Sequence, residues 1–348
     1  MPDQPATTQA TTRATDVDAD TMRRVYEESK TPFKYGVILR HPEKDGLVDC
    51  PVVFRFNNRW YMTYVAMAGK VGYETELAVS DDLLKWERLG TILPHAKEGW
   101  DAWQADGGMS LIDTAWGGSY APGQHMGRYW MSYIGGDQHG YEPDPLSMGL
   151  AWTETPDKPT SWTRNPENPI MRPSDDSARP FEKKTLYKST IIRDDAETLQ
   201  HPFVMFYNAK QEGKQAIERI GCAVSADMLH WSRHGEGPVV EHVGNGISGD
   251  PQIVRMTLDG MKKPIWVMHY FGHRWRPKAF DIFACSHDLV HWTKWDGPSL
   301  IEPSEPWDKT FAHKPWVIKH DGVVYHFYCA VGDQGRVIAV ATSKDMRR

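Results

Sequence analysis

The apolar residues of this chain are grouped in short runs that end at polar or glycine-containing turns, a pattern typical of antiparallel β-strands. Segments 48–66, 249–272 and 313–332 each hold two such runs. The turns between the paired runs contain dipeptides that favour tight reversals, namely Asn57-Asn58, Asp259-Gly260 and Asp321-Gly322. Each segment therefore predicts a β-hairpin, and the one candidate helix covers residues 19–30.

A short motif of the form Ser-x-Asp, followed four residues later by Trp, recurs after an apolar strand. Its copies begin at Ser80, Ser225, Ser286 and Ser343, and the last copy has no Trp. An Asp two residues after the Ser can accept hydrogen bonds from the backbone N–H groups of a turn. The Trp can then pack against a neighbouring strand. The motif predicts a repeated unit of strand, capped turn and strand.

Five such units can be aligned on their first strands. They begin at Asp49, Asp106, Lys188, Asp250 and Lys314. A repeat of about 60 residues has room for four antiparallel strands, as in one blade of a β-propeller. The expected outermost strands are segments 88–95, 168–173, 235–242 and 296–303.

The last unit has no outermost strand of its own, and segment 34–42 has the form of one. Pairing this segment with the last unit would leave no open sheet edge between them. The sequence therefore predicts an all-β, five-bladed β-propeller with four antiparallel strands per blade, closed by an N-terminal strand. This single domain covers residues 34–348, and residues 1–33 form a flexible leader with a short helix.

Composition narrows the classes of function. The chain has 40 Lys and Arg residues against 46 Asp and Glu residues, so its net charge is −6 and it has no basic bias for nucleic acid. No apolar run is long enough to span a membrane. The 15 Trp residues favour a carbohydrate-stacking surface or a β-rich core. The four Cys residues lack metal-type spacing and are expected to be buried thiols.

Residues 1–22 are rich in Thr and Ala and have no apolar core of a signal peptide. A leader of this kind often follows a removed signal sequence. The expected location is therefore periplasmic or extracellular, with a cytoplasmic location as the alternative.

Three motifs carry a resemblance to a known superfamily: Val48-Asp49-Cys50-Pro51, Gly249-Asp250-Pro251 and His313-Lys314-Pro315. Together with the hairpins that follow them, they resemble the five-bladed β-propeller glycosidases, which include glycoside hydrolase families 43, 117 and 130. The resemblance implies that acidic residues at the starts of the innermost strands point into an axial funnel and hydrolyse a glycosidic bond.

In this chain the first residues of the units would form a ring of three carboxylates and two ammonium groups, Asp49, Asp106, Lys188, Asp250 and Lys314, with His313 beside the last. Carboxylates and lysines in one small cavity shift the pKa of one another, so an acid and a base can coexist. We expect an inverting glycoside hydrolase that removes a terminal sugar, with Asp49 as the general base. Asp106, Asp250 and His313 complete the expected catalytic set.

The general acid has several candidates. The resemblance to family 117 implies His313, but the adjacent Lys314 would lower the pKa of its imidazole. Glu74, Glu182 and Glu218 remain alternatives.

Planar polar and aromatic side chains near the funnel are the expected substrate-binding residues: Trp103, Gln104, Glu182, Lys188, His273, Arg274, Trp275 and Lys314. The basic residues suit an anionic or anhydro sugar, or inorganic phosphate, which would make the enzyme a glycoside phosphorylase. The alternative is that the two lysines neutralise the aspartates. A non-catalytic, carbohydrate-binding propeller is a further alternative, although it would repeat the same polar residues in each blade.

The sequence has no set of metal ligands and no cofactor-binding motif in a suitable structural context. Some relatives hold a divalent cation on the propeller axis, and His313 with the three aspartates would be its ligands. The two lysines argue against it. The expected partner is an oligo- or polysaccharide substrate.

Overall fold

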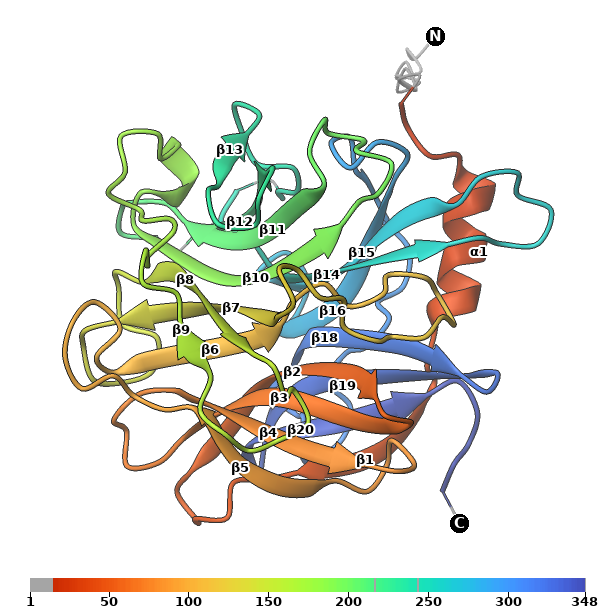
Figure 1. Ribbon diagram of the computed structural model, residues 1–348. Coiled ribbons are helices and arrows are strands. Elements are labelled where there is room, and N and C mark those ends of the chain that lie inside the picture. The colour runs from red at the N-terminus through yellow and green to blue at the C-terminus, as the bar shows by residue number, and fades with distance from the viewer. Residues whose placement is uncertain (1–14, 216, 243, 348) are drawn as a thin grey trace, which may run out of the picture.

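We describe a computed structural model of the chain, in which residues 15–215, 217–242 and 244–347 are described (Figure 1). The prediction of a flexible leader lies largely outside these residues. The helix expected at 19–30 is α1 (Ala19–Ser29). It starts at Asp18, whose carboxylate accepts a hydrogen bond from the N–H of Thr21 at 2.9 Å, as an N-cap residue does. None of the described helices is long and apolar enough to cross a membrane.

The apolar side of α1 packs on the body of the molecule. Met22 and Val25 are buried against Val254, Ile265 and Phe283 of three β-strands. Burial of these side chains, rather than helix propensity, is what stabilises so short a helix.

Strands make up the rest of the fold and form three sheets. The first sheet contains β2 (Leu47–Phe56), β3 (Arg59–Met67), β4 (Glu74–Ser80) and β5 (Glu87–Leu93). The second contains β6 (Gln104–Met109), β7 (Tyr129–Gly136), β8 (Ser147–Thr153) and β9 (Thr163–Arg164).

The third sheet has twelve strands. In chain order they are β1 (Phe33–Leu39), β10 (Thr185–Arg193), β11 (Phe203–Lys210), β12 (Glu218–Ser225), β13 (Ser232–His234), β14 (Ile247–Met256), β15 (Ile265–His273), β16 (Ala279–Ser286), β17 (Thr293–Lys294), β18 (Phe311–His320), β19 (Val323–Gly332) and β20 (Gly335–Thr342). A short 3-10 turn, η1 (Pro180–Glu182), precedes β10.

This large sheet differs from the separate four-stranded units that the sequence predicts. It consists of three antiparallel groups joined by single parallel pairs, Glu218 with Ile247 and Ala279 with Phe311. In each parallel pair, the first residue of the third strand of one group lies beside the first residue of the first strand of the next group. One such pair of residues is enough to join the two groups into one sheet. With the two smaller sheets, the strands form five successive antiparallel groups.

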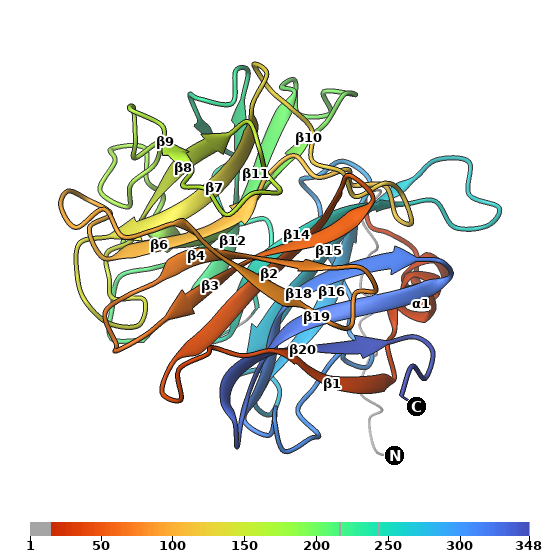
Figure 2. The same cartoon turned by 60° about the horizontal axis from the view of Figure 1, so that its bottom comes forward.

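The first strands of the five groups, β2, β6, β10, β14 and β18, contact one another in a closed ring. β1 pairs antiparallel with β20, so the N-terminal strand completes the last group (Figure 2). The first strands therefore converge on a common centre, which is where side chains from all five groups can meet.

The outermost strands are shorter than the sequence predicts in three groups. β9, β13 and β17 have two or three residues, and segments 168–173, 235–242 and 296–303 contribute only isolated bridges such as Ile220 with Val240. Each segment contains a proline, which has no N–H to donate to a ladder. The predicted segment 88–95 is largely strand, as β5.

The Ser-x-Asp motif forms the capped turn that the sequence predicts. The hydroxyl of Ser80 accepts from the N–H of Leu83 at 2.9 Å, and the carboxylate of Asp82 accepts from the N–H of Lys85 at 2.8 Å. The indole N–H of Trp86 donates to the carbonyl of Leu83 at 3.0 Å. The copies at Ser225 and Ser286 form the same Ser–Asp hydrogen bonds.

Pairing of β1 with β20 should contribute strongly to stability. Deletion of residues 1–41 removes α1 and β1, whereas deletion of residues 1–31 removes α1 alone. We expect the longer deletion to lower the free energy of unfolding by several kcal/mol more, because it exposes the ladder of β20 and breaks the buried ion pair of Lys34 with Asp308. Urea unfolding measures the difference, and equal stability of the two proteins would contradict the closing role of β1.

Candidate active site

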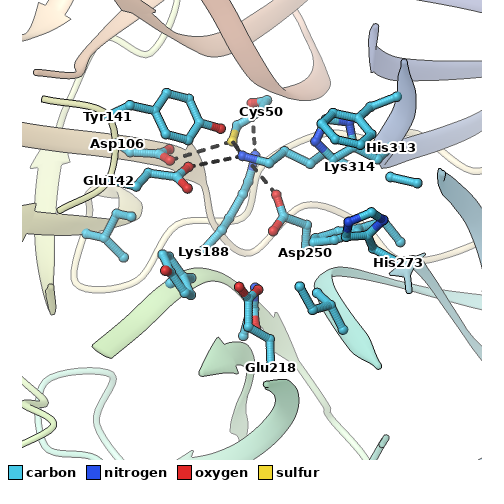
Figure 3. A pocket seen from close by; sticks show the side chains of 17 residues that line it. Cys50, Asp106, Tyr141, Glu142, Lys188, Glu218, Asp250, His273, His313 and Lys314 are labelled. Carbon is cyan, nitrogen blue, oxygen red and sulfur yellow. Dashed lines mark hydrogen bonds and ion pairs between the residues drawn. The ribbon is translucent and has the colours of Figure 1, made fainter. Parts of the chain in front are cut away.

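A cavity of about 260 Å³ opens where the first strands converge (Figure 3). All five groups of strands contribute to its lining. Its charged and ionisable residues are Cys50, Asp106, Glu142, Lys188, Glu218, Asp250, His273, His313 and Lys314. Its aromatic residues are Tyr141, Tyr187, Phe271 and Phe311.

Three of these residues share an unusual backbone. Cys50, Asp250 and Lys314 have φ values of 53°, 50° and 63°, and each precedes a proline. The left-handed region is costly for a residue with a side chain, and such strain concentrates at functional sites. In each case the pairing with the second strand shifts register at this point. The three β-bulges are therefore equivalent and direct the three side chains into the cavity.

This equivalence corrects the alignment of the units by one residue in the first group. The sequence aligns Asp49 with Asp250 and Lys314, but Cys50 takes that place in the structure. A residue one position before the bulge residue can still reach the cavity, as His313 does in the last group. Asp49, at the same position in the first group, is fully buried and does not line the cavity.

The side chains at the floor of the cavity contact one another. The thiol sulfur of Cys50 lies 3.5 Å from Asp106 Oδ2 and 3.8 Å from Asp250 Oδ2, and Lys314 Nζ lies 3.4 Å from it. Lys188 Nζ donates to the carbonyl of Cys50 at 2.9 Å. Burial, reinforced by Asp106, raises the pKa of Cys50 well above its usual value, so it is a neutral thiol.

Asp49 lies behind the floor as the partner of two cations. Its Oδ2 accepts from Lys314 Nζ and from Arg336 Nη1, both at 2.9 Å, and from the hydroxyl of Tyr141 at 3.2 Å. Burial alone would raise the pKa of Asp49, but the charges of Lys314 and Arg336 hold it well below its usual range. A carboxylate so strongly paired is a weak proton acceptor.

Three carboxyl groups of the cavity have the opposite tendency. Burial raises the pKa of Glu218 to about 7, against the hydrogen bond that it accepts from Asn208. Burial also raises the pKa of Asp106 to about 7, although Lys188 and Lys314 oppose the shift. The pKa of Asp250 is raised by burial as well. At neutral pH Glu218 and Asp106 can therefore hold a proton that ordinary carboxyl groups have lost.

Glu142 is the fourth carboxylate of the cavity. It comes from the loop between β7 and β8, and its side chain is 16% exposed. Its Oε1 accepts from Lys314 Nζ at 3.1 Å, which holds it beside the floor (Figure 3). Glu142 and Glu218 are thus carboxyl groups from different groups of strands, with different partners.

His313 lies at the cavity as a neutral imidazole. Burial, together with the charge of Arg336, lowers its pKa to about 3. Its Nδ1 donates to the carbonyl of Cys329 at 3.2 Å. At neutral pH His313 therefore has no imidazolium proton to give to a leaving group.

Among the predicted substrate-binding residues, Lys188, His273 and Lys314 line the cavity. Trp103, Gln104, Glu182, Arg274 and Trp275 do not belong to its lining in the described part of the chain.

Packing accounts for several of these positions. Gln104 supports the loop of Tyr141 and Glu142, because its Nε2 donates to the carbonyls of Gln138 and Gly140, both at 2.9 Å. Trp275 stacks on His242, with ring centroids 3.7 Å apart.

Glu182, one of the alternative acids, is fully buried and accepts hydrogen bonds from Arg179, Arg233 and Tyr207. Glu74, another alternative, contacts His95 away from the cavity. Of the three alternative acids, the structure places only Glu218 in the cavity lining.

The residues present do not fit a divalent cation on the axis. Lys314 and Lys188 bring two ammonium groups to the floor, and these would repel a divalent cation. Within the described ranges, no group of three or more His, Cys, Asp or Glu side chains has an arrangement that could hold a metal ion.

Sequence reasoning missed Cys50, Tyr141 and Asn208 as cavity residues. Cys50 was missed because the bulge shifts the register. The other two belong to a loop and to a second strand, whose positions over the cavity depend on the tertiary fold. Two signals were available. The polar loop between the second and third strands of the second group contains Tyr141 and Glu142, and a proline follows Cys50 as it follows Asp250 and Lys314.

No protein-family model matches the sequence, and no curated protein matches it. Two solved structures resemble it over almost its whole length. One, a complex of BT0996 with RGII, is 44% identical, with a TM-score of 0.90, and the match covers 96% of this chain and 97% of the other. A structure described as "Glycoside hydrolase" is also 44% identical over the same shares, with a TM-score of 0.89.

A more distant structure has the same fold. A family 117 glycoside hydrolase of the marine bacterium Zobellia galactanivorans is 14% identical, with a TM-score of 0.61 and coverage of 91% of each chain.

Proposed function

Because this chain belongs to the propeller glycoside hydrolases, we propose that its cavity removes a terminal sugar from an oligosaccharide, with Glu218 and Glu142 as the catalytic pair. The observation that carries the proposal is that one cavity holds a carboxyl group with a raised pKa and a second carboxylate in an ion pair. Two carboxyl groups in different environments are what acid–base cleavage of a glycosidic bond requires.

The fold supplies the frame for this pair. The five groups of strands, with β1 as the outermost strand of the last, are interpreted as five blades of a propeller closed between its chain ends. In such a fold the first strands surround an axis, and a ligand binds where they converge at one end.

Glu218 is the proposed general acid. A general acid works best when its pKa lies near the working pH, and burial brings the pKa of Glu218 to about 7. Glu218 would protonate the oxygen of the leaving sugar as the bond to the terminal sugar breaks. The neutral imidazole of His313 does not suit this role.

Glu142 is the proposed general base. The ion pair with Lys314 holds its carboxylate at the cavity, where it can take a proton from water. Attack of that water on the face opposite to the leaving group would invert the anomeric carbon. Asp49 keeps a different role here, as the charge partner that holds Lys314 and Arg336 in place.

Closure of the lower end favours cleavage at a chain end. Below the cavity, the Gln252 side chain bonds both backbone groups of Val317, at 2.6 and 2.8 Å, and the Trp316 indole donates to Val53 at 2.9 Å. A separate cavity lined in part by Gln252 and Trp316 has a volume of only about 20 Å³, little more than one water molecule. Close packing of this kind leaves no room for a polysaccharide, so a terminal sugar would enter from the open end.

The charges of the lining favour a terminal sugar without a negative charge. Lys314 is already held by Asp49 and Glu142, and Lys188 donates to the carbonyl of Cys50, so both ammonium groups have partners in the protein. These contacts also disfavour inorganic phosphate as a co-substrate. Because a similar protein forms a complex with RGII, an RGII oligosaccharide is the first substrate to test.

The test is incubation with RGII oligosaccharides, with and without phosphate, followed by proton NMR of the first product. We expect one monosaccharide, released with inverted configuration at a rate that does not depend on phosphate. Retention would make Glu142 a nucleophile instead of a base. Release of internal fragments would contradict cleavage at the chain end, and release of a sugar phosphate would indicate a phosphorylase.

A further inference from the structure

Asn208 lies beside Glu218 at the cavity. It belongs to β11, is 2% exposed and lines the cavity beside Glu218. Its Nδ2 donates to Glu218 Oε2 at 3.0 Å. Its Oδ1 is buried and has no hydrogen-bond partner among the described residues. A buried amide oxygen without a partner is costly, so it points to a ligand that donates a hydrogen bond.

Gly249 provides the space for this amide group. A Cβ atom at position 249 would lie 2.3 Å from Nδ2 of Asn208 and 2.7 Å from the ring of Phe271, closer than any normal contact. The φ of Gly249 is not in the left-handed region, so space and not backbone conformation requires glycine here. The bulge residue Asp250 follows Gly249 directly. The start of β14 therefore leaves space for the amide of Asn208 and directs the side chain of Asp250 into the cavity.

We propose that Asn208 positions Glu218 through its amide N–H and accepts a hydrogen bond from a hydroxyl of the terminal sugar through its amide oxygen. The proposal rests on the proposed function, in which Glu218 is the general acid. One planar amide would then fix the distance between the acid and a sugar hydroxyl, so that the proton is delivered to the leaving oxygen in a defined geometry. Gly249 is part of the same arrangement, because a larger residue would displace the amide.

The hydrogen bond from Asn208 also favours the ionised form of Glu218 and lowers its pKa against the effect of burial. Loss of this bond should raise the pKa further. Carboxyl titration of the substrate-free protein by infrared spectroscopy follows this directly, with Glu218→Gln to identify the signal. We expect Asn208→Ala to raise the titration midpoint of Glu218 by about one pH unit. Gly249→Ala should give a similar shift.

Asn168→Ala is the matched control. Asn168 also donates two side-chain hydrogen bonds, to Tyr133 and to the carbonyl of Leu150, at 3.0 and 2.9 Å, but it is not in the cavity lining. This variant should lose stability without a shift of the Glu218 midpoint. An unchanged midpoint in both Asn208→Ala and Gly249→Ala would overturn the proposal.

Kinetics on RGII oligosaccharides test the contact with the sugar. Asn208→Ala should lower kcat/KM about ten- to a hundredfold, and the alkaline limb of its pH profile should move upward with the midpoint. A kcat/KM equal to that of the unmodified protein would overturn the hydroxyl contact. The infrared titration needs no substrate, so a shifted midpoint in a protein that releases no sugar would reject the glycosidase assignment and leave the contact between Asn208 and Glu218 supported.

Discussion

Glu218→Gln should lower kcat by about two to four orders of magnitude, because glutamine has no proton to give to the leaving oxygen. Burial places the pKa of Glu218 at about 7, so activity should fall as the pH rises through that value. The alkaline limb of the pH profile should therefore disappear in the variant. Substrates with an activated leaving group, such as nitrophenyl glycosides, should lose less rate because they need less protonation.

Glu74→Gln is the matched control, since Glu74 contacts His95 outside the cavity and should tolerate the change. An equal loss of rate on activated and natural substrates would argue against Glu218 as the acid. The alkaline limb would then have to come from Asp106, the other carboxyl group whose pKa burial raises to about 7, and Asp106→Asn would remove it.

Asp49→Asn should lower the free energy of unfolding by about 3–5 kcal/mol, which is typical when one partner of a buried ion pair is removed. Asp49 is fully buried, so Arg336 would lose its charge partner and Lys314 would keep only Glu142. Urea unfolding at pH 7 measures this. Asp81→Asn is the matched control, because it breaks only the exposed pair with Arg59 and should change stability far less.

The loss of stability in Asp49→Asn should also depend on pH. The pKa of Asp49 is lowered on folding, so its contribution to stability is present above the pKa of the unfolded chain and is lost as the pH falls through the folded value. The difference between the original protein and Asp49→Asn should therefore shrink in acid. A variant that keeps full stability at pH 7 but loses turnover would support the sequence-based hypothesis of Asp49 as the general base.

Much of the fold could be predicted because its signals are local. Alternating apolar runs and turn dipeptides specify hairpins, and the Ser-x-Asp motif forms its turn from residues within one short segment. The same holds for the helix at α1 and for the membership of the propeller glycosidases, which is confirmed. The short outermost strands depend on prolines, and the joined twelve-stranded sheet depends on contacts between groups of strands. The alignment of the repeats took neither into account.

The candidate site was predictable in part. The starts of the first strands do bring Asp106, Lys188, Asp250 and Lys314 to one cavity, as their common place in the repeat requires. Asp49 lies outside the cavity lining, because Cys50 takes the bulge position in the first group, and its role as general base stays a prediction. The proline that follows each bulge residue was the available signal, because an alignment on it places Cys50 with Asp250 and Lys314.

The sequence by itself therefore determined which strands repeat and which end of them carries charge, because both follow from residues close together along the chain. Only the tertiary structure decided which carboxyl groups are buried, paired or open to a ligand. Glu142, Asn208 and Glu218 come from a loop, a second strand and a third strand, and they share one cavity only because the groups of strands pack around it. Burial and charge partners set the protonation behaviour of the cavity's carboxyl groups, and both are properties of that packing.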